Sequence, residues 1–588
     1  MDIIVAPNII KYLIKLLDRT SPTKQISDHV AEKPLFSYSK DGEKLVRVRP
    51  EDKGISSKLI GSFLYEANTV KKLDLHGIMI LKDGDVICDV TNDGHSSDIP
   101  HVWHSLSKSV TSMAIGMLID EGKISLDDKV VKILDKKVGP LSALGYRNLT
   151  VRHLLTMTSG ASFAEIGTVV EKNWLRAYFE SGVSFQHGKK FNYNSLNSYV
   201  LSCIVKEVSG KGLCAFLKPR LFDPLAIKTY HWEKSPEGVE NGGWGLYLKR
   251  EDVAKLAQLY LNDGIWNGKR IISEKWIRES TTPLVKTPDA FGSFDYGYHI
   301  WSNKRKNMFL FNGMFCQDAL VLRNQRMIII TNGGIEQLFQ QSEYYELIDR
   351  YFNTDNPKIP YNISLNKIKK SLSGKTVQHK ATFFSRRLPK AVKRSLGCIY
   401  SSADISHLPF KNAQKGGSTA SFGVLPLTEQ LIRNSYATGI RSACLRREDK
   451  KLYFDVEEGE GIKRLPLLPG KTIESVLKFG VTEYRACIRS KFTKNEDGDD
   501  VLVIRVTFPE VSSTRYIKVF FKNDKLDIAM SESPGLGLVF MFADEIERII
   551  KKNKTIADMV SMLDSDSVFN KLEKRFEPRF TLFKDIQA

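Results

Sequence analysis

The 588-residue sequence is poor in the features that mark metal modules, disulfide scaffolds and membrane proteins. Its seven cysteines form no C-x-x-C pair, and no Cys/His cluster has the spacing of a zinc site. No stretch reaches the roughly 18 uninterrupted apolar residues that a membrane-spanning helix needs. We therefore expect reduced thiols, no metal, no other cofactor and no membrane partner.

The first residues also lack the pattern of an export signal. Asp2 stands where such a signal carries basic residues, and Pro7, Lys11 and Lys15 interrupt the apolar run. Residues 9–17, IIKYLIKLL, can form a short amphipathic helix, for which packing on the protein is favoured over contact with a membrane. A cytoplasmic protein is expected.

Acidic residues are few relative to basic ones. The chain has 87 Lys+Arg against 68 Asp+Glu, a net charge of +19, and residues 361–588 hold +13 of it. Such an excess raises nucleic acid as a partner. The β-type runs of this region alternate charged and apolar residues, as solvated strands do, and no RRM or helix-turn-helix signature is present. We expect no nucleic-acid partner.

Composition and periodicity divide the chain into four parts: an arm at 1–45, a large domain at 46–355, a basic Lys/Ser-rich linker at 356–395, and a β-rich domain at 396–588. In the large domain, hairpin-like runs at 77–94 and 318–334 bracket helical segments that begin near 107, 149, 194 and 251. This pattern predicts an α+β fold, an antiparallel sheet flanked by helices with a helical subdomain. The last part predicts a small β-barrel-like accessory domain, with a helical tail at roughly 542–575.

The most informative segment is HVWHSLSKSVTSMAIGMLIDEG at 101–122. Ser105 and Lys108 form S-x-x-K at the start of a helix, where positions i and i+3 share one face. The helix N-terminus favours negative charge on the serine oxygen, and a desolvated lysine can accept the serine proton. The pair predicts a nucleophilic serine with a lysine base, although S-x-x-K alone is common by chance.

Two later segments carry groups that complete this chemistry. Tyr193-Asn194-Ser195 has the form Y-x-N/S, and a tyrosine beside a lysine can shuttle a proton to a leaving group. FNGMFCQDALVL at 311–322 places Gly313 in a strand where a substrate can lie, so the N–H groups of Met314 and Ser105 can both bind an oxyanion. Taken singly, a tyrosine is more often a core residue and a strand glycine more often a bulge.

Together these motifs resemble the serine β-lactamase/penicillin-binding-protein-like superfamily, in its class C-type branch of esterases and amide hydrolases. That family orders its motifs as S-x-x-K, Y-x-N/S and a K/H-x-G-type strand. Flanking segments are similar as well, among them LTVRHLLTMTSG at 149–160 and YGYHIW at 296–301. The resemblance covers about 45–340 and implies a β-lactamase/transpeptidase-like domain.

Carried over residue by residue, the resemblance implies that Ser105 is the acylated nucleophile, Lys108 its base and Tyr193 the general acid/base. It places Ser195 where the family often has Asn, and it assigns Asn312, Gly313 and Met314 to the strand that binds substrate and oxyanion. Phe311 departs from the pattern, because it replaces the cation that pairs with a β-lactam or peptide carboxylate. Cys316 also departs, since esterase-type members have G-x-x-G-Q here.

These observations favour a serine hydrolase that hydrolyses, or transfers the acyl group of, a small ester or amide. Two alternatives stay open: a catalytically silent hydrolase scaffold that acts as a binding protein, and a β-lactamase or D-peptidase. Neither the substrate nor the oligomeric state follows from the sequence. Candidates for an apolar acyl pocket are Trp174, Tyr178, Trp244, Tyr247 and Trp301, each of which alone is more often a core residue.

Overall fold

The computed structural model describes residues 29–585 with gaps. The gaps are 40, 71–72, 164, 169–170, 304, 337–342, 375, 378–387, 403–421, 436, 438, 460, 536–572 and 575. The helix expected at 9–17 and nearly all of the expected helical tail lie outside the described residues. Among those described, 31–91 and 96–372 form one compact unit, and 92–95 group with the residues from 373 onward in a second.

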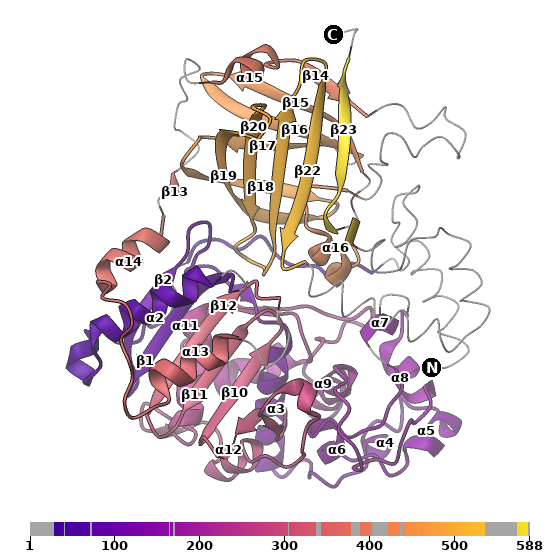
Figure 1. The fold of residues 1–588 in the computed structure, drawn as a ribbon. Helices are drawn as coiled ribbons and strands as arrows, with labels where there is room; N and C mark the ends of the chain where they lie inside the picture. Colours follow the sequence, from indigo (N-terminus) through magenta and orange to yellow (C-terminus); the bar gives the residue numbers. More distant parts are fainter. Residues whose placement is uncertain are drawn as a thin grey trace. The chain divides into compact units, whose positions relative to one another are not determined.

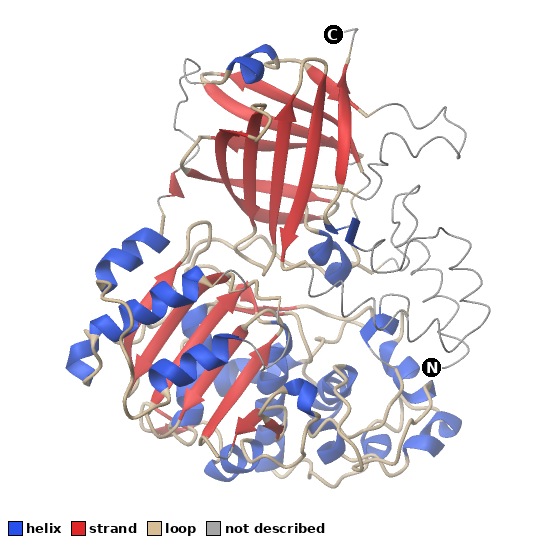
Figure 2. Cartoon of the chain, viewed as in Figure 1, coloured by secondary structure: helices blue, strands red, loops and turns tan. Residues whose placement is uncertain are grey.

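The first unit is built on a seven-stranded sheet with the order β2-β1-β12-β11-β10-β9-β8 (Figures 1 and 2). Every neighbouring pair is antiparallel. Its strands are β1 (Leu75–Lys82), β2 (Asp85–Thr91), β8 (Asp295–Tyr296), β9 (Trp301–Asn303), β10 (Met308–Gly313), β11 (Gln317–Leu322) and β12 (Met327–Gly333). Five short strands lie outside it: β3 (His101–Val102), β4 (His231–Trp232), β5 (Leu246–Leu248), β6 (Ile265–Trp266) and β7 (Lys269–Arg270).

Local sequence explains the turns of this sheet. Lys82 pairs with Asp85, so Asp83 and Gly84 form a two-residue turn, both with positive φ (50° and 86°). This is the geometry that Asp-Gly favours in a tight hairpin. The expected turn after Leu322 is also present, because Leu322 pairs with Met327.

Helices cover both faces of the sheet. Those of the first unit are α2 (Ser57–Thr69), α3 (Ser107–Asp120), α4 (Val130–Ile133), α5 (Pro140–Tyr146), α6 (Val151–Leu155), α7 (Glu165–Thr168), α8 (Trp174–Glu180), α9 (Leu196–Ser209), α10 (Leu213–Leu217), α11 (Arg250–Leu261), α12 (Glu274–Ser280), α13 (Glu343–Phe352) and α14 (Leu365–Leu372). Short 3₁₀ turns are η1 (Pro50–Lys53), η2 (His104–Leu106) and η4 (Asp289–Phe291), and η3 (Lys218–Phe222) is a π-turn.

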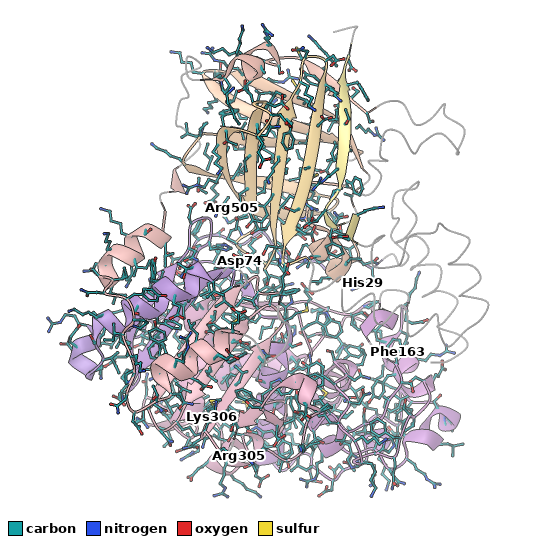
Figure 3. All side chains as sticks on the ribbon, in the orientation of Figure 1. His29, Asp74, Phe163, Arg305, Lys306 and Arg505 are labelled. Carbon is teal, nitrogen blue, oxygen red and sulfur yellow. The ribbon has the colours of Figure 1, made fainter. Side chains whose placement is uncertain are left out.

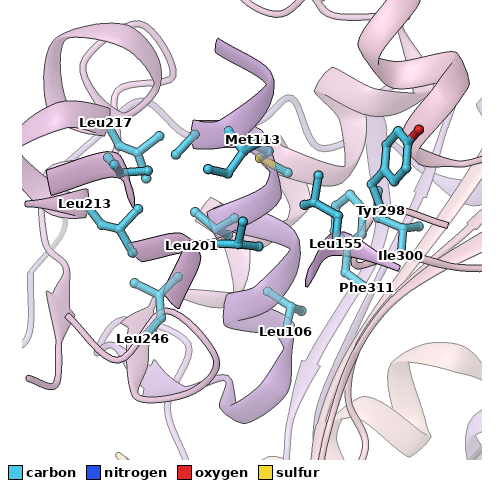
Figure 4. Close-up of a cluster of buried hydrophobic side chains, with 14 of the residues drawn as sticks. Leu106, Met113, Leu155, Leu201, Leu213, Leu217, Leu246, Tyr298, Ile300 and Phe311 are labelled. Atoms are coloured by element: carbon cyan, nitrogen blue, oxygen red, sulfur yellow. The ribbon is translucent and has the colours of Figure 1, made fainter. Parts of the chain in front are cut away.

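The alternation of side chains along the strands creates two cores. Phe309 and Phe311 point into the core shared with α3, α9 and α11, part of which Figure 4 shows. Leu310 and Leu320 point into the opposite core, where α2, α13 and α14 pack. Polar contacts also hold the outer helices: Lys306, labelled in Figure 3, donates to Asp349 of α13 at 2.5 Å.

The second unit contains an eleven-stranded sheet with the order β13-β18-β19-β20-β21-β22-β23-β14-β15-β16-β17. Apart from the parallel β13–β18 pair, its pairs are antiparallel. The strands are β13 (Thr376–Val377), β14 (Ile399–Ser401), β15 (Ile440–Glu448), β16 (Lys451–Glu458), β17 (Gly461–Leu467), β18 (Thr472–Phe479), β19 (Thr482–Lys494), β20 (Asp500–Thr507), β21 (Thr514–Phe521), β22 (Lys525–Ser533) and β23 (Arg579–Lys584). Two helices, α15 (Lys390–Arg394) and α16 (Leu427–Arg433), accompany it.

This sheet curls until its ends meet. Lys463 of β17 donates to the carbonyl oxygen of Lys478 in β18 at 2.6 Å, so the antiparallel strands form a nearly closed barrel. The predicted fold class is confirmed for both parts: an antiparallel sheet flanked by helices, followed by a barrel-like sheet. The predicted domain boundaries stay a prediction.

Candidate active site

Ser105 lies in the η2 turn, directly before helix α3. His104, the residue before it, has φ 42°, a conformation that is unfavourable for a residue with a Cβ. The Ser107 hydroxyl donates to the His104 carbonyl oxygen at 2.6 Å and fixes this turn. The chain therefore changes direction sharply at the serine, whose side chain stays partly exposed.

Lys108 lies one helical turn further on and is only 1% exposed. Its Nζ is 2.8 Å from Ser105 Oγ and 2.8 Å from the carbonyl oxygen of Gly243. The same Nζ lies 4.8 Å from the centre of the Tyr193 ring. The structure thus brings together the three residues predicted to be catalytic.

Tyr193 is held in place by aromatic neighbours and by its backbone. Its ring stacks on Trp301, with centroids 5.9 Å apart and planes at 23°, and a half-buried Phe291 lies beside both. The preceding residue, Asn192, donates its N–H to the Met157 carbonyl oxygen at 2.8 Å. These contacts leave Tyr193 half-buried over Lys108.

Ser195 is buried at the start of α9 and lies against Gly243. A Cβ built on Gly243 would come within 3.2 Å of Ser195 Cβ. Because the Gly243 carbonyl oxygen binds Lys108, Ser195 lies beside the Lys108 site. The neighbouring Asn194 has a different task, since its amide donates to the Phe163 carbonyl oxygen and thus supports the loop.

Gly313 brings the predicted substrate strand against the nucleophile segment. A Cβ at this position would overlap the carbonyl oxygen of Trp103, two residues before Ser105, so only glycine permits this approach. The N–H groups of Ser105 and Met314 take no part in the turn, loop and cap hydrogen bonds between backbone groups of the described residues. Both are therefore candidates to bind an oxyanion.

The two candidate amides share an unusual setting. Met314 is followed by Phe315 and Cys316, whose φ angles are 65° and 66°. The Phe315 ring packs edge-on against the ring of His104, with centroids 5.5 Å apart. One strained residue flanks each candidate amide, and the two flanking side chains are in contact.

Asn312 is tied to a buried acid. Its Nδ2 donates to Asp318 Oδ1 at 2.7 Å, and the Tyr345 hydroxyl donates to Asp318 Oδ2 at 2.6 Å. Burial raises the pKa of Asp318 to about 6, against these hydrogen bonds and one from Cys316, which lower it. Asn312 is predicted to bind substrate, but one of its amide hydrogens is already donated to Asp318.

Phe311 occupies the position of the family cation. Its side chain is fully buried and packs against Tyr260, with ring centroids 5.0 Å apart and planes at 90°. It belongs to the core between the sheet and the helices (Figure 4). This position therefore offers no charge to a substrate.

The proposed acyl-pocket aromatics separate into two groups. Trp301 stacks on Tyr193, and the half-buried Trp244 follows Gly243, so these two lie near the site. Three others are core residues: Trp174, Tyr178 and Tyr247 are buried.

His299 was not found by sequence reasoning. It is buried with φ 58°, and its Nε2 lies 2.8 Å from the Ser198 hydroxyl, while Nδ1 has no hydrogen-bond partner in the described part of the chain. Burial, assisted by the charge of Lys108, lowers the pKa of His299 to about 3. It therefore stays neutral at working pH. The segment YGYHIW at 296–301 contains it, but no role was predicted for the histidine, because its contacts depend on the turn before β9.

The structure brings together a serine and a buried lysine at a helix N-terminus, a tyrosine over the lysine, and a strand edge beside them. Residues 71–331 match the Beta-lactamase family model. This part of the chain is therefore similar to the proteins of the Beta-lactamase family. Among the described residues, no group of three or more His, Cys, Asp or Glu could hold a metal ion.

Individual relatives are distant. The 6-aminohexanoate-dimer hydrolase of Paenarthrobacter ureafaciens is 24% identical over 263 residues, which cover 39% of this chain and 65% of that protein. Penicillin-binding protein 4* of Bacillus subtilis is 26% identical over 155 residues, 24% of this chain and 33% of its own. The chain thus spans less than two thirds of either relative. The solved structure of EstCE1, a hydrolase with promiscuous acyltransferase activity, is 14% identical and covers 51% of this chain and 99% of its own, with a TM-score of 0.41.

Replacing Gly313 tests the close approach of the strand. In Gly313→Ala the new Cβ meets the Trp103 carbonyl oxygen, so the strand must move away from Ser105 and carry Met314 with it. We expect kcat for an activated ester to fall about 100-fold, the usual effect of losing one oxyanion donor. Gly139→Ala is the control, because a Cβ there meets only Ser142 Oγ at 3.8 Å. Equal kcat in both variants would contradict this account.

Acid stability tests the neutral state of His299. Below about pH 6.5 the histidine of the unfolded chain is protonated, whereas folded His299 stays neutral down to about pH 3. The stability due to this residue is complete above pH 6.5 and decreases as the pH falls toward 3. Between pH 7 and pH 4 the unfolding free energy of wild type should fall by about 1 to 3 kcal/mol more than that of His299→Gln. Urea unfolding at both pH values measures this, and identical losses would refute it.

Proposed function

We propose that the chain is a serine hydrolase that forms an acyl-enzyme on Ser105 from a small ester or amide. The observation that carries this proposal is the contact of the buried Lys108 amine with Ser105 Oγ at 2.8 Å, beneath the ring of Tyr193. A buried amine that touches the serine hydroxyl is suited to take its proton.

The first half of the reaction follows from these contacts. Lys108, as the neutral amine, takes the hydroxyl proton while Ser105 Oγ attacks the carbonyl carbon of the substrate. The negative charge passes to the carbonyl oxygen, where the N–H groups of Ser105 and Met314 stabilise it. Tyr193, above Lys108, delivers a proton to the departing oxygen or nitrogen as the bond to it breaks.

The second half uses the same groups in reverse. After the first half Tyr193 is a phenolate and Lys108 an ammonium. Water gives one proton to the Tyr193 phenolate while its oxygen attacks the acyl carbon; the bond from that carbon to Ser105 Oγ then breaks, the acid leaves, and Lys108 returns its proton to Ser105 Oγ. An alcohol or amine in place of water gives acyl transfer. The name of EstCE1 joins hydrolase and acyltransferase activity in one protein of this fold, and both outcomes are proposed here.

The substrate is proposed to be uncharged near the reacting carbonyl. A β-lactam or D-peptide presents a carboxylate, and Phe311 places no cation at the family position for it. Asn312 also donates one amide hydrogen to Asp318. The named relative acts on the 6-aminohexanoate dimer, which agrees with amide chemistry outside the β-lactams.

The compartment and the partners are also proposed rather than established. The seven cysteines at described positions are free thiols, as in proteins of the cytoplasm. None of the described helices is long and apolar enough to cross a membrane. The partner proposed is the small substrate alone, and the second unit is proposed as an accessory domain.

Labelling with a fluorophosphonate tests the nucleophile. Wild type should be modified on Ser105, as read by intact mass and peptide mapping, and Ser105→Ala should not be modified. Lys108→Arg keeps a hydrogen-bond donor near Ser105 but cannot serve as a base at neutral pH, so labelling should slow by about 10²- to 10⁴-fold. Ser184→Ala, an exposed serine on a loop, is the control and should label normally. A folded wild type with neither labelling nor hydrolysis of p-nitrophenyl esters would support the silent-scaffold alternative.

A substrate panel tests the missing cation. A charge-assisted hydrogen bond contributes about 1.5 to 3 kcal/mol, so its absence should weaken turnover of carboxylate-bearing substrates. We expect kcat/KM for short-chain p-nitrophenyl esters to exceed that for a cephalosporin by at least about 100-fold. Ser105→Ala controls for background hydrolysis in both series. Rapid cephalosporin turnover would instead identify a β-lactamase.

A further inference from the structure

A hollow lies in the helical part of the first unit, and none of the residues assigned to catalysis lines it. It has a volume of about 490 Å³. The segments that line it lie before α4, at the end of α5, in α6 and after α8. Its lining residues are Lys129, Leu144, Gly145, Arg147, Asn148, His153, Val183, Gln186 and His187, and no carboxylate is among them.

Two backbone carbonyl oxygens fix the His187 ring beside the hollow. Its Nδ1 lies 2.5 Å from the Ser159 carbonyl oxygen and its Nε2 lies 3.2 Å from the Gly145 carbonyl oxygen. The ring also stacks on Tyr146, with centroids 5.9 Å apart and planes at 22°. Both ring nitrogens thus face the protein, so His187 forms part of the wall.

Two cations, Lys129 and Arg147, border the hollow. In the part of the chain that the structure describes, neither Lys129 nor Arg147 forms an ion pair or a side-chain hydrogen bond. The acids nearest in sequence are already engaged. Asp127 accepts two hydrogen bonds from Arg152, and Asp128 accepts from the N–H and hydroxyl of Ser125.

His153 lies beside His187 in the wall of the hollow. Its ring lies 6.0 Å from that of His187, and its Nδ1 accepts the Thr150 N–H at 3.2 Å. Burial, then the charges of His187, Lys129 and Arg152, lower the pKa of His153 to about 4, while Asp127 raises it. His153 is therefore neutral at pH 7.

We propose that this hollow is a binding site for a small oxyanion, a phosphate or carboxylate group, held by Lys129 and Arg147. Arg147 offers a planar fork of donors that fits two oxygens of such a group. Lys129 adds a point charge, and the amides of Asn148 and Gln186 add neutral donors at the rim. The site is independent of the proposed hydrolase activity, since it uses none of its residues.

Calorimetric titration of the full chain with inorganic phosphate at pH 7 tests the site. Ionic strength is kept constant with sodium chloride, because surface charge effects are screened by salt. We expect saturable binding to one site in wild type and at least a tenfold loss of affinity in the double variant Lys129→Gln/Arg147→Gln. Sulfate and acetate titrations separate a phosphoryl from a carboxylate preference, and either preference supports an oxyanion site.

A charge-matched pair on α12 serves as the control. Lys275→Gln/Arg278→Gln removes the same two charges from exposed positions outside the hollow and should bind phosphate within twofold of wild type. Thermal melts without phosphate show whether each variant is folded. If the double pocket variant is unfolded, the single variant Arg147→Gln at an exposed position takes its place, and its affinity for phosphate should fall at least threefold. The proposal would be overturned if wild type showed no saturable binding or if the pocket variant bound phosphate as wild type does. It would also be overturned if both pairs of substitutions lowered the affinity for phosphate equally.

Discussion

The close packing of Gly313 against the Trp103 backbone is the constraint on which the candidate site depends. It fixes the distance between the strand that bears Met314 and the turn that bears Ser105, because no side chain intervenes. On either side of this contact the chain adopts strained backbone, at His104 and at Phe315. Such residues cost about 1 to 3 kcal/mol each and persist where surrounding packing over-determines them. The ring contact between the two residues supplies part of that packing.

Helix α3 connects this contact to the rest of the site. Lys108, Ser109, Thr111 and Ser112 are all buried, and each donates to a backbone carbonyl oxygen of one of two loops. Lys108 and Thr111 bind the loop at Gly242–Gly243, whereas Ser109 and Ser112 bind the loop at Tyr298–His299. One helix thus satisfies loop carbonyls that would otherwise be buried without donors. The same helix carries Lys108, which contacts Ser105 Oγ, and holds the loop that precedes Trp301, on which Tyr193 stacks.

The sequence predicts those parts of the site that depend on short spacing. Ser105 and Lys108 are three residues apart on a helix, so their contact follows from helical geometry alone, and Asp83-Gly84 specifies its hairpin in the same way. The roles of these residues remain predictions. His299 and Asp318 could not be found, because each reaches the site through tertiary structure: a turn places His299 against Ser198, and strand register sets Asp318 opposite Asn312. Cys316 shows the same limit. The φ angle of 66° at this position favours glycine. The cysteine that stands there has a buried thiol, which forms a hydrogen bond with Asp318.

The C-terminal region also contains buried charged residues, which its net charge does not reveal. Inside the second unit, Arg515 and Glu532 form a buried ion pair at 2.8 Å, and Glu532 also accepts the N–H groups of Leu427 and Thr428 at the start of α16. Arg433, at the other end of α16, pairs with Glu429 at 2.7 Å while both are buried. Burying such pairs gains little net stability, but leaving one member unpaired costs about 3 to 5 kcal/mol. A helix displaced along the barrel would remove the N–H groups of Leu427 and Thr428 from the buried Glu532 carboxylate. Glu532 therefore holds the start of α16 on the barrel, whereas the Arg433–Glu429 pair lies within the helix itself.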